Sequence, residues 1–436
     1  MEDLQRNNSS ARTERALLVA VVLPDSTADP ANPLGELRSL VRTAGGQVID
    51  EMYVRRRKVH PGYYVGSGKA REMARRAEEN EADVIIFDND LTPAQIRDLE
   101  EVTGRKTIDR SELILDIFAA HARTNESRLQ VELAQLEYTY PRLRHMWTHL
   151  ERIAGGAASA AGGIGTRGPG EKQIEVDRRL VRKRVSYLRR RIGEIDRRKV
   201  RQVRRRKDAF CVCLVGYTNA GKSTLMRLLT GAEVHIADQL FATLDTKTRR
   251  WRVGGGGTAL LSDTVGFVRD LPHHLVASFR ATLEEAIHAD LLLHVADASH
   301  DRVVQQIQAV DRVLDELGCA TDRRLLVLNK LDLVNDPTVL TVLRRKYAGA
   351  LALSAITGSG AEDLTAAVSH RLDGSTMRVS LRANCRNGRL MRYIEQYAEV
   401  SDRTFVGATA RIEAVMSARR LEMLRAFGDD VSVVKH

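Results

Sequence analysis

One eight-residue stretch limits the possible folds of this chain more than any other. It reads Gly216-Tyr217-Thr218-Asn219-Ala220-Gly221-Lys222-Ser223 and fits the pattern G-x-x-x-x-G-K-S. The apolar run 210–215 before it predicts a buried parallel strand, and residues 224–229 after it have helical composition. Between a strand and a helix, the pattern predicts a phosphate-binding loop. Backbone N–H groups would surround a polyphosphate, Lys222 would contact the terminal phosphates, and Ser223 would offer its hydroxyl to Mg²⁺.

A second motif lies where the metal side of such a protein is expected. Asp263-Thr264-Val265-Gly266 follows an apolar strand. Asp263 would hold the Mg²⁺ shell, and the N–H of Gly266 would contact a γ-phosphate. The pattern D-x-x-G is common by itself, but its order and distance after the phosphate loop favour this interpretation.

A third motif indicates which base is bound. Asn329-Lys330-Leu331-Asp332 follows the apolar strand 325–328. The carboxylate of Asp332 can accept hydrogen bonds from N1–H and the 2-amino group of guanine, while Lys330 would lie along the base and Asn329 would brace the loop. The stretch Ser354-Ala355-Ile356 would offer backbone N–H groups to the guanine oxygen. Because the wrong base leaves polar groups unpaired, the motif favours GTP over ATP.

Two features bear on hydrolysis. The loop Phe241-Ala242-Thr243-Leu244-Asp245-Thr246-Lys247-Thr248 lies where the first nucleotide-sensing loop is expected, and a threonine hydroxyl there would complete the Mg²⁺ shell. Spacing does not choose among the three threonines. Phe267 follows D-x-x-G at the position where many GTPases carry a glutamine that orients water, which a phenyl ring cannot do. We therefore expect slow intrinsic hydrolysis.

The alternation of apolar runs predicts an α/β chain of four domains. Residues 12–108 predict a small α/β domain, and residues 109–208 predict a long antiparallel helical hairpin with a Gly-rich tip loop and a basic second helix. Residues 209–375 predict a P-loop GTPase domain with a doubly wound, mainly parallel sheet. Residues 376–436 predict a small α+β domain, read as a strand, a helix at 389–399, a strand at 405–415 and a closing helix-like stretch.

The hairpin is predicted from two apolar seams. The first comprises Leu129, Leu133, Leu136, Tyr140, Leu143, Trp147 and Leu150, and the second comprises Val181, Val185, Leu188, Ile192 and Ile195. Both recur at alternating spacings of four and three, as in coiled coils. Pro141 predicts a break near Tyr140. The Gly-rich stretch 155–170 separates the seams, so we expect two helices that fold back on each other.

Most of the basic charge lies in the second helix. The chain carries a net charge of +11, whereas residues 178–207 alone hold sixteen Lys and Arg against Glu194 and Asp196. A solvated helix face is the ordinary explanation. The excess of one sign favours a nucleic-acid partner instead, because the charges repel one another unless a polyanion neutralises them. An anionic membrane fits less well, since the apolar seam already faces the partner helix. The RNA-binding candidates are Arg167, Lys172, Arg182, Lys183, Arg189, Arg190, Arg197, Arg198, Arg204, Arg205 and Arg206.

Composition adds three expectations. The stretch from Met1 to Arg15 has no apolar core of a signal peptide, and no run reaches the roughly 18 apolar residues of a membrane span, so we expect a soluble cytoplasmic protein. The four cysteines lack metal-site spacing, and Cys211 and Cys213 are more simply explained as packing in a buried strand. We expect a monomer when the protein is free.

The chain resembles the HflX-type GTPases, a family of ribosome-associated GTP hydrolases, over about residues 16–375. Beyond the nucleotide motifs, the resemblance rests on residues 108–118, 129–136, 167–171, 241–245 and 263–267. It implies that Thr243 is the switch threonine and Mg²⁺ ligand, which makes Lys222, Thr243 and Gly266 the candidate catalytic residues. Asn219 matches an asparagine that related GTPases use with K⁺, so K⁺ is a candidate second cation. Lys172, where a threonine is usual, and the Ala-rich tip loop depart from the family pattern.

The resemblance also implies a partner. The family binds the large ribosomal subunit through its N-terminal and helical domains, so we expect a GTP-hydrolysing factor that contacts rRNA, is partly ribosome-associated and acts on stalled ribosomes by subunit splitting or recycling. A ribosome-assembly GTPase would use the same residues. A GTP-gated rRNA-binding module with incidental hydrolysis is an alternative of another class. Whether large subunits raise turnover distinguishes the last from the others.

Overall fold

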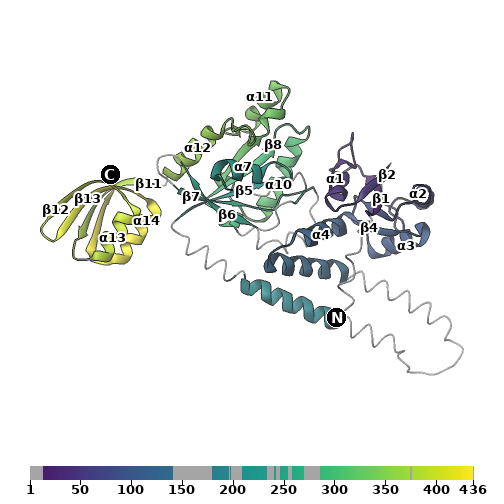
Figure 1. The fold of residues 1–436 in the computed structure, drawn as a ribbon, viewed down its shortest axis with the longest axis horizontal. Helices are drawn as coiled ribbons and strands as arrows, with labels where there is room; N and C mark the ends of the chain where they lie inside the picture. The colour runs from purple at the N-terminus through teal and green to yellow at the C-terminus, as the bar shows by residue number, and fades with distance from the viewer. Residues whose placement is uncertain are drawn as a thin grey trace.

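Within the residues that the structure describes, three β-sheets organise the chain (Figure 1). The computed structural model describes residues 13–140, 179–195, 197, 209–232, 240–241, 246–253, 258–269, 285–373 and 376–435. The N-terminal and C-terminal sheets lie on opposite sides of the central six-stranded sheet (Figure 1). The predicted fold class is confirmed in these parts of the chain.

The N-terminal unit is a parallel four-stranded sheet with helices on both faces. Its strands β1 (Arg15–Val22), β2 (Gln47–Arg55), β3 (Val84–Phe87) and β4 (Lys106–Asp109) lie in the order β2-β1-β3-β4. Two apolar clusters cover its faces: α1 (Gly35–Thr43) and α4 (Arg110–His121) contribute to one, and α2 (Ser67–Glu79) and α3 (Pro93–Thr103) to the other. Local sequence sets α3: Thr92 and Gln95 form a capping box before it, and Gly104 ends it in the left-handed conformation.

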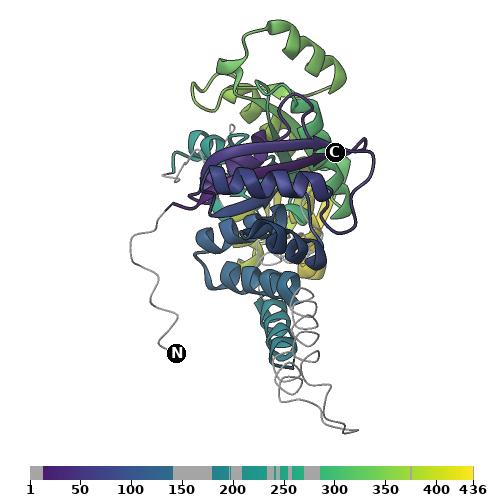
Figure 2. The same cartoon turned by 90° about the vertical axis from the view of Figure 1, so that its right-hand side faces the viewer.

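Two helices, at residues 125–140 and 179–195, lie against each other beside this unit (Figure 2). Leu133, Leu188 and Ile192 are buried between them, with Leu129, Leu136 and Val185 packed around these three. The predicted seam is therefore confirmed for these six residues. The outer seam residues Leu143, Trp147 and Leu150, the break at Pro141 and the tip loop lie outside the described residues.

The central sheet has the order β10-β9-β8-β5-β7-β6. It comprises β5 (Phe210–Gly216), β6 (Lys247–Arg252), β7 (Thr258–Asp263), β8 (Leu291–Asp297), β9 (Arg324–Asn329) and β10 (Leu351–Ala352), and only the β6–β7 pair is antiparallel. The helices that the structure describes around it include α7 (Lys222–Thr230), α10 (Val303–Glu316), α11 (Pro337–Lys346) and α12 (Ala361–Asp373), with short 3-10 turns η1 (Thr321–Arg323) and η2 (Leu331–Leu333). Sequence reasoning missed β6, because this edge strand is mostly basic and buries little besides Trp251.

The C-terminal unit differs from its sequence-based description. It is an antiparallel sheet of β11 (Thr376–Asn384), β12 (Glu399–Val406), β13 (Thr409–Ser417) and β14 (Val431–Lys435), in the order β12-β13-β11-β14, with α13 (Gly388–Tyr397), α14 (Ala418–Leu424) and the 3-10 turn η3 (Arg425–Asp430). The expected single strand 405–415 is wrong: Gly407, at φ 61°, turns the chain into a hairpin. The expected helix-like stretch after that strand is present as α14, but the expectation missed β14, whose short Val-Ser-Val pattern pairs with β11.

None of the helices in the described ranges combines the length and apolar character needed to cross a bilayer.

The helix pair gives a first test. Leu188 is fully buried, whereas Leu180 on the same helix is 57% exposed. Leu188→Ala should lower the local opening free energy of residues 125–140 and 179–195 by about 2 to 4 kcal/mol, since it removes a buried side chain and leaves a cavity. The matched variant Leu180→Ala should change it by less than about 0.5 kcal/mol. Hydrogen exchange measured by mass spectrometry reports both, and equal effects would contradict this packing.

Candidate functional site

The predicted phosphate loop lies at the carboxyl end of β5, which is an inner strand of the central sheet. β5 is flanked by parallel β7 and β8, and α7 begins at Lys222. Gly221 has φ +91°, and a Cβ atom there would lie 2.2 Å from Nδ2 of Asn329. Only glycine fits this turn. The N-terminal end of α7 therefore faces the loop, as anion binding requires.

Lys222 is buried, with 7% of its surface exposed. Its Nζ donates hydrogen bonds to the backbone oxygens of Gly216 and Tyr217, at 3.1 and 2.7 Å. Burial lowers the pKa of Lys222 to about 8, although the negative charge of Asp263 opposes the shift. No described residue forms an ion pair with it within 4 Å, and an anion such as phosphate would therefore stabilise its charged form.

Oxygen donors lie beside this lysine. The Ser223 hydroxyl donates to Oδ2 of Asp263 at 2.6 Å, and Asp263 is fully buried at the end of β7. The buried Oγ1 of Thr218 has no hydrogen-bond partner among the residues that the structure describes. Hydroxyl and carboxylate oxygens are ligands that Mg²⁺ prefers, so these donors fit the ion.

Asn329 joins the phosphate loop to the region predicted to read the base. Its Nδ2 donates to the backbone oxygen of Ala220 at 2.8 Å, and its Oδ1 accepts from the N–H of Ala355 at 2.9 Å. The side chain is 1% exposed. One buried amide therefore fixes two loops, which is the geometry that a bracing residue needs.

The other base-reading candidates surround this amide. Lys330 is in the left-handed conformation, and its Nζ lies 2.7 Å from Oδ2 of Asp297. The Ser354 hydroxyl donates to Oδ1 of Asp332, which is exposed. Leu331 packs partly buried against a neighbouring cluster, whereas Ile356 is 72% exposed.

Several predicted site residues direct their side chains away from this loop. Thr264 is buried and donates to the backbone oxygen of Leu214 at 2.7 Å. Val265 and Phe241 belong to the apolar core of the N-terminal unit, and the phenolic group of Tyr217 reaches Glu36. We therefore expect only the backbone of these residues to contact a nucleotide. Ala242, Thr243, Leu244 and Asp245 lie outside the described residues.

The basic helix is partly neutralised by the helix that faces it. Arg184 lies 2.6 Å from Glu132, and Arg189 lies 2.8 Å from Glu137. The Nε of Arg182 donates to the hydroxyl of Tyr140 at 2.8 Å. The expectation that the charges of this helix repel one another is therefore wrong for Arg184 and Arg189, whose carboxylate partners come from the facing helix. Arg191 also pairs with Glu194 of its own helix at 2.9 Å.

The RNA-binding candidates that the structure describes are all exposed: Arg182, Lys183, Arg189, Arg190 and Arg197. Arg167, Lys172, Arg198, Arg204, Arg205 and Arg206 lie outside the described residues.

Sequence reasoning missed a group of charges next to the phosphate loop, of which Asp88 and Arg110 are buried and Glu36 and Arg269 are partly exposed. Glu36, Asp88, Arg110 and Arg269 form ion pairs between the N-terminal unit and the segment after Gly266. Arg110, a charged residue that directly precedes the helical stretch with the buried Leu113, Ile114 and Leu115, is the signal that could have found them.

The parallel sheet, the buried lysine at the start of α7, the adjoining Ser–Asp pair and the Asn-Lys-x-Asp loop define a P-loop protein of the guanine-nucleotide-binding class. Family models match along most of the chain. Residues 31–119 match "GTP-binding GTPase N-terminal", residues 121–206 match "GTP-binding GTPase Middle Region", and residues 211–330 match "50S ribosome-binding GTPase".

Curated relatives cover the same span. GTPase HflX of Escherichia coli is 45% identical over 381 residues, which are 86% of this chain and 87% of the relative. GTPase HflX of Caldanaerobacter subterraneus is 39% identical over 429 residues, 98% of this chain and 95% of the relative. The chain belongs to the HflX family of GTPases and is itself a GTPase.

Among solved structures, a GTP-binding protein from Sulfolobus solfataricus in complex with GDP aligns at 22% identity and a TM-score of 0.42, covering 82% of this chain and 98% of that one.

The buried lysine generates a pH prediction. The free site disfavours the charged form of Lys222, so its proton is lost above a pKa of about 8, whereas bound phosphate stabilises that form. Binding must therefore take up a proton as the pH rises through 8, and affinity must fall. We expect the Kd for GDP to rise about fivefold between pH 7.0 and 8.7. Titration calorimetry in two buffers of different ionisation enthalpy measures both quantities. A flat profile without proton uptake would contradict the lowered pKa.

Proposed function

We propose that this chain is a GTP-hydrolysing factor that binds the large, 50S-type ribosomal subunit through its N-terminal and helical parts, and that it acts on stalled or stressed ribosomes by splitting or recycling subunits. The observation that carries the proposal is the match of residues 211–330 to a family model described as 50S ribosome-binding GTPase. The basic helix supports rRNA as the direct partner, because its exposed Lys183, Arg190 and Arg197 can contact phosphates. Such a protein would be cytoplasmic, partly ribosome-associated and monomeric when free.

We further propose how the nucleotide is held. Lys222 neutralises the terminal phosphates, Ser223 and Thr243 would ligate Mg²⁺, and Asp263 would hold the ion's shell. Mg²⁺, when bound, neutralises developing charge on the phosphates. The backbone of the phosphate loop and the N–H of Gly266 donate to phosphate oxygens, while Asp332 reads guanine. K⁺ beside Asn219 stays a proposal, as do the domain limits 12–108, 109–208, 209–375 and 376–436.

Intrinsic hydrolysis is proposed to be slow. The ring of Phe267 is 3% exposed and packs in an apolar cluster with Val215 and Leu292. No side chain at this position can orient the attacking water, so hydrolysis depends on groups that position and neutralise the phosphates. A ribosomal partner that orders the loop around Thr243 would supply what is missing.

Base recognition can be tested by one substitution. Asp332→Asn should weaken GTP and permit xanthosine triphosphate, because the amide donates where the carboxylate accepts and xanthine carries an oxygen in place of the 2-amino group. Asp336→Asn is the matched control, since Asp336 caps α11 through the N–H of Thr338 and makes no contact with the other base-reading residues. Competition binding with both nucleotides measures the switch. Unchanged guanine preference in Asp332→Asn would remove Asp332 from the base site.

The ribosomal role is tested with purified subunits. Large subunits should bind in the presence of a nonhydrolysable GTP analogue but less with GDP, and should raise single-turnover GTP hydrolysis by about 10³-fold or more. Light scattering of intact ribosomes should fall with GTP if the factor splits them. Fast hydrolysis that is indifferent to subunits would contradict the partner-gated mechanism, and binding only to immature particles would favour the assembly role.

Charge variants test the rRNA contact within the same assay. Replacing Lys183, Arg190 and Arg197 by Gln should weaken subunit binding and flatten its salt dependence by about 0.7 to 0.9 log units per log salt for each phosphate that is no longer neutralised. The double variant Glu132→Gln with Arg184→Gln removes a paired acid and base and leaves the net charge unchanged, so it should keep the wild-type slope. Equal slopes in all three proteins would support a solvated helix face.

A further inference from the structure

Four charged side chains form a closed ring between the N-terminal unit and the nucleotide-binding unit. Arg110 of α4 lies 2.7 Å from Asp88 and 3.1 Å from Glu36. Arg269, which follows Gly266 by three residues, lies 3.7 Å from Glu36 and also contacts Asp88. Two acids and two bases balance each other. The side chains of Asp88 and Arg110 are at most 5% exposed, so the ring is largely shielded from water.

The ring reaches the phosphate loop through one hydroxyl. The hydroxyl of Tyr217 donates to Oε1 of Glu36 at 2.7 Å and accepts from the backbone N–H of Arg269 at 2.7 Å. That N–H also lies 3.3 Å from Oε1 of Glu36. Burial raises the pKa of Glu36, but the charges of Arg110 and Arg269 and the hydrogen bond from Tyr217 outweigh it, so the pKa lies below its usual value. Glu36 is thus ionised at neutral pH and holds both segments.

These contacts close the phosphate loop against the Asp263–Gly266 motif. The N–H of Thr218 donates to the oxygen of Phe267 at 2.7 Å, and the N–H of Phe267 donates to the oxygen of Gly216 at 3.1 Å. A Cβ atom on Gly266 would lie 2.9 Å from Nζ of Lys222. A Cβ atom there would also lie 2.8 Å from the Cα of Thr218, so Gly266 is in close contact with the phosphate loop. A γ-phosphate that accepts hydrogen bonds from both this Nζ and the N–H of Gly266 would have to enter this contact. The motif must therefore move outward before GTP can bind as proposed.

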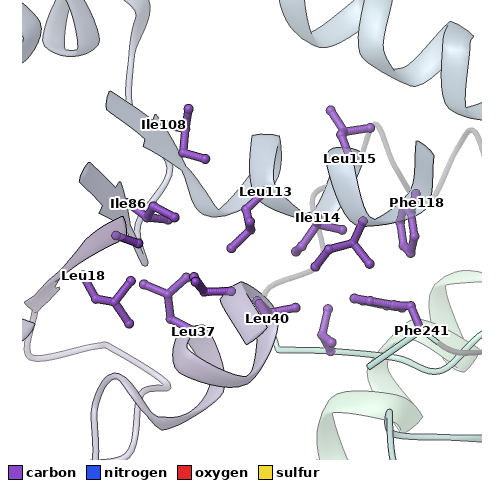
Figure 3. Packing of buried hydrophobic residues seen from close by; sticks show 14 of the residues in the cluster. Leu18, Leu37, Leu40, Ile86, Ile108, Leu113, Ile114, Leu115, Phe118 and Phe241 are labelled. Atoms are coloured by element: carbon purple, nitrogen blue, oxygen red, sulfur yellow. The ribbon is translucent and has the colours of Figure 1, made fainter. Parts of the chain in front are cut away.

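An apolar contact supports the same arrangement. Phe241 lies across from α4 in the core of the N-terminal unit, where its ring meets Phe118 edge-on with centroids 4.6 Å apart (Figure 3). Val265 and Val268, on either side of Gly266, belong to that core as well. Phe241 of the first nucleotide-sensing loop and Val265 of the Asp263–Gly266 motif are thus packed in the core of the N-terminal unit.

We propose that Glu36 is a positioning residue of the GTPase: it holds Tyr217 and Arg269 in an arrangement that accepts GDP but excludes a γ-phosphate, so that GTP binds only by releasing Arg269 from the ring. This inference rests on the proposed placement of GTP on the phosphate loop. A cavity of about 630 Å³ is lined by Glu36, Tyr217, Thr218 and Arg269 together with residues of α1 and α10, and gives the released segment space to move into. Glu36 acts from the N-terminal unit, so the γ-phosphate and the position of that unit become coupled.

The test compares affinities for GDP and for a nonhydrolysable GTP analogue. Glu36→Gln and Tyr217→Phe should each raise the ratio of GTP-analogue affinity to GDP affinity by about threefold to tenfold, the worth of one or two hydrogen bonds. Tyr217→Phe keeps the aromatic side chain and removes only its hydroxyl. If Glu36→Gln folds poorly, the affinity ratio of Tyr217→Phe alone tests the proposal. Glu51→Gln is the matched control: Glu51 pairs with Arg38 of α1 at 2.6 Å and is not part of the ring. It should leave the ratio unchanged.

Hydrogen exchange supplies a readout that a merely structural role would not move. In the wild type, the amide of Arg269 should stay protected with GDP and lose protection with the GTP analogue. An affinity ratio that is unchanged or lowered in both variants, or an Arg269 amide that stays protected with the analogue, would overturn the proposal. If the wild-type protein fails to bind GDP, or if GDP binding survives Lys222→Ala, the proposed placement of the nucleotide is contradicted instead.

Discussion

The burial of Lys222 is the constraint on which the nucleotide site depends. Its ammonium group donates hydrogen bonds to backbone oxygens of its own loop, and the residue is 7% exposed at the start of α7. Removing such a charge from water costs several kcal/mol unless an opposite charge joins it. The fold tolerates this because β5 is paired on both sides and Asn329 fixes the far end of the loop. Part of the affinity for a polyphosphate therefore comes from its negative charge, which offsets the cost of burying the Lys222 ammonium group in the free protein.

The ring of Glu36, Asp88, Arg110 and Arg269 solves the same problem in the opposite way, since its charges are balanced within the protein. A buried ion pair adds little net stability over a well-packed apolar contact, but removing one partner typically costs about 3 to 5 kcal/mol. The ring thus favours one arrangement of the N-terminal unit against the nucleotide-binding unit, but it adds little to the stability of that contact. That property suits a contact that must hold firmly in one nucleotide state and separate in another, whereas the apolar core around Phe118 and Phe241 supplies the cohesion.

The parts that could be predicted from the sequence are those that local rules determine. The phosphate loop, the guanine-reading loop and the inner seam of the helix pair all follow from spacing within short stretches. The contact from Glu36 to Tyr217 spans 181 positions in the chain, and no periodicity or motif brings the two together. Likewise β14 pairs with β11 across about fifty residues, so its short valine-rich pattern could equally belong to a loop. Arg189 and Glu137 looked unpaired because their helices meet only in the folded hairpin.

The role of Phe267 is only partly visible in the sequence. Its sequence position indicates only that a water-orienting glutamine is missing. The structure puts its ring in a core with Val215 and Leu292, where truncation would leave a cavity costing about 3 to 5 kcal/mol. Meanwhile its backbone N–H and oxygen bond Gly216 and Thr218. Phe267 therefore joins the phosphate loop to the Asp263–Gly266 motif. Its ring packs in the apolar cluster, and its backbone bonds to the phosphate loop. A glutamine could make the same backbone bonds, but it would bury its amide in this apolar cluster without a partner from the cluster, so the packing favours a phenyl ring over a water-orienting side chain.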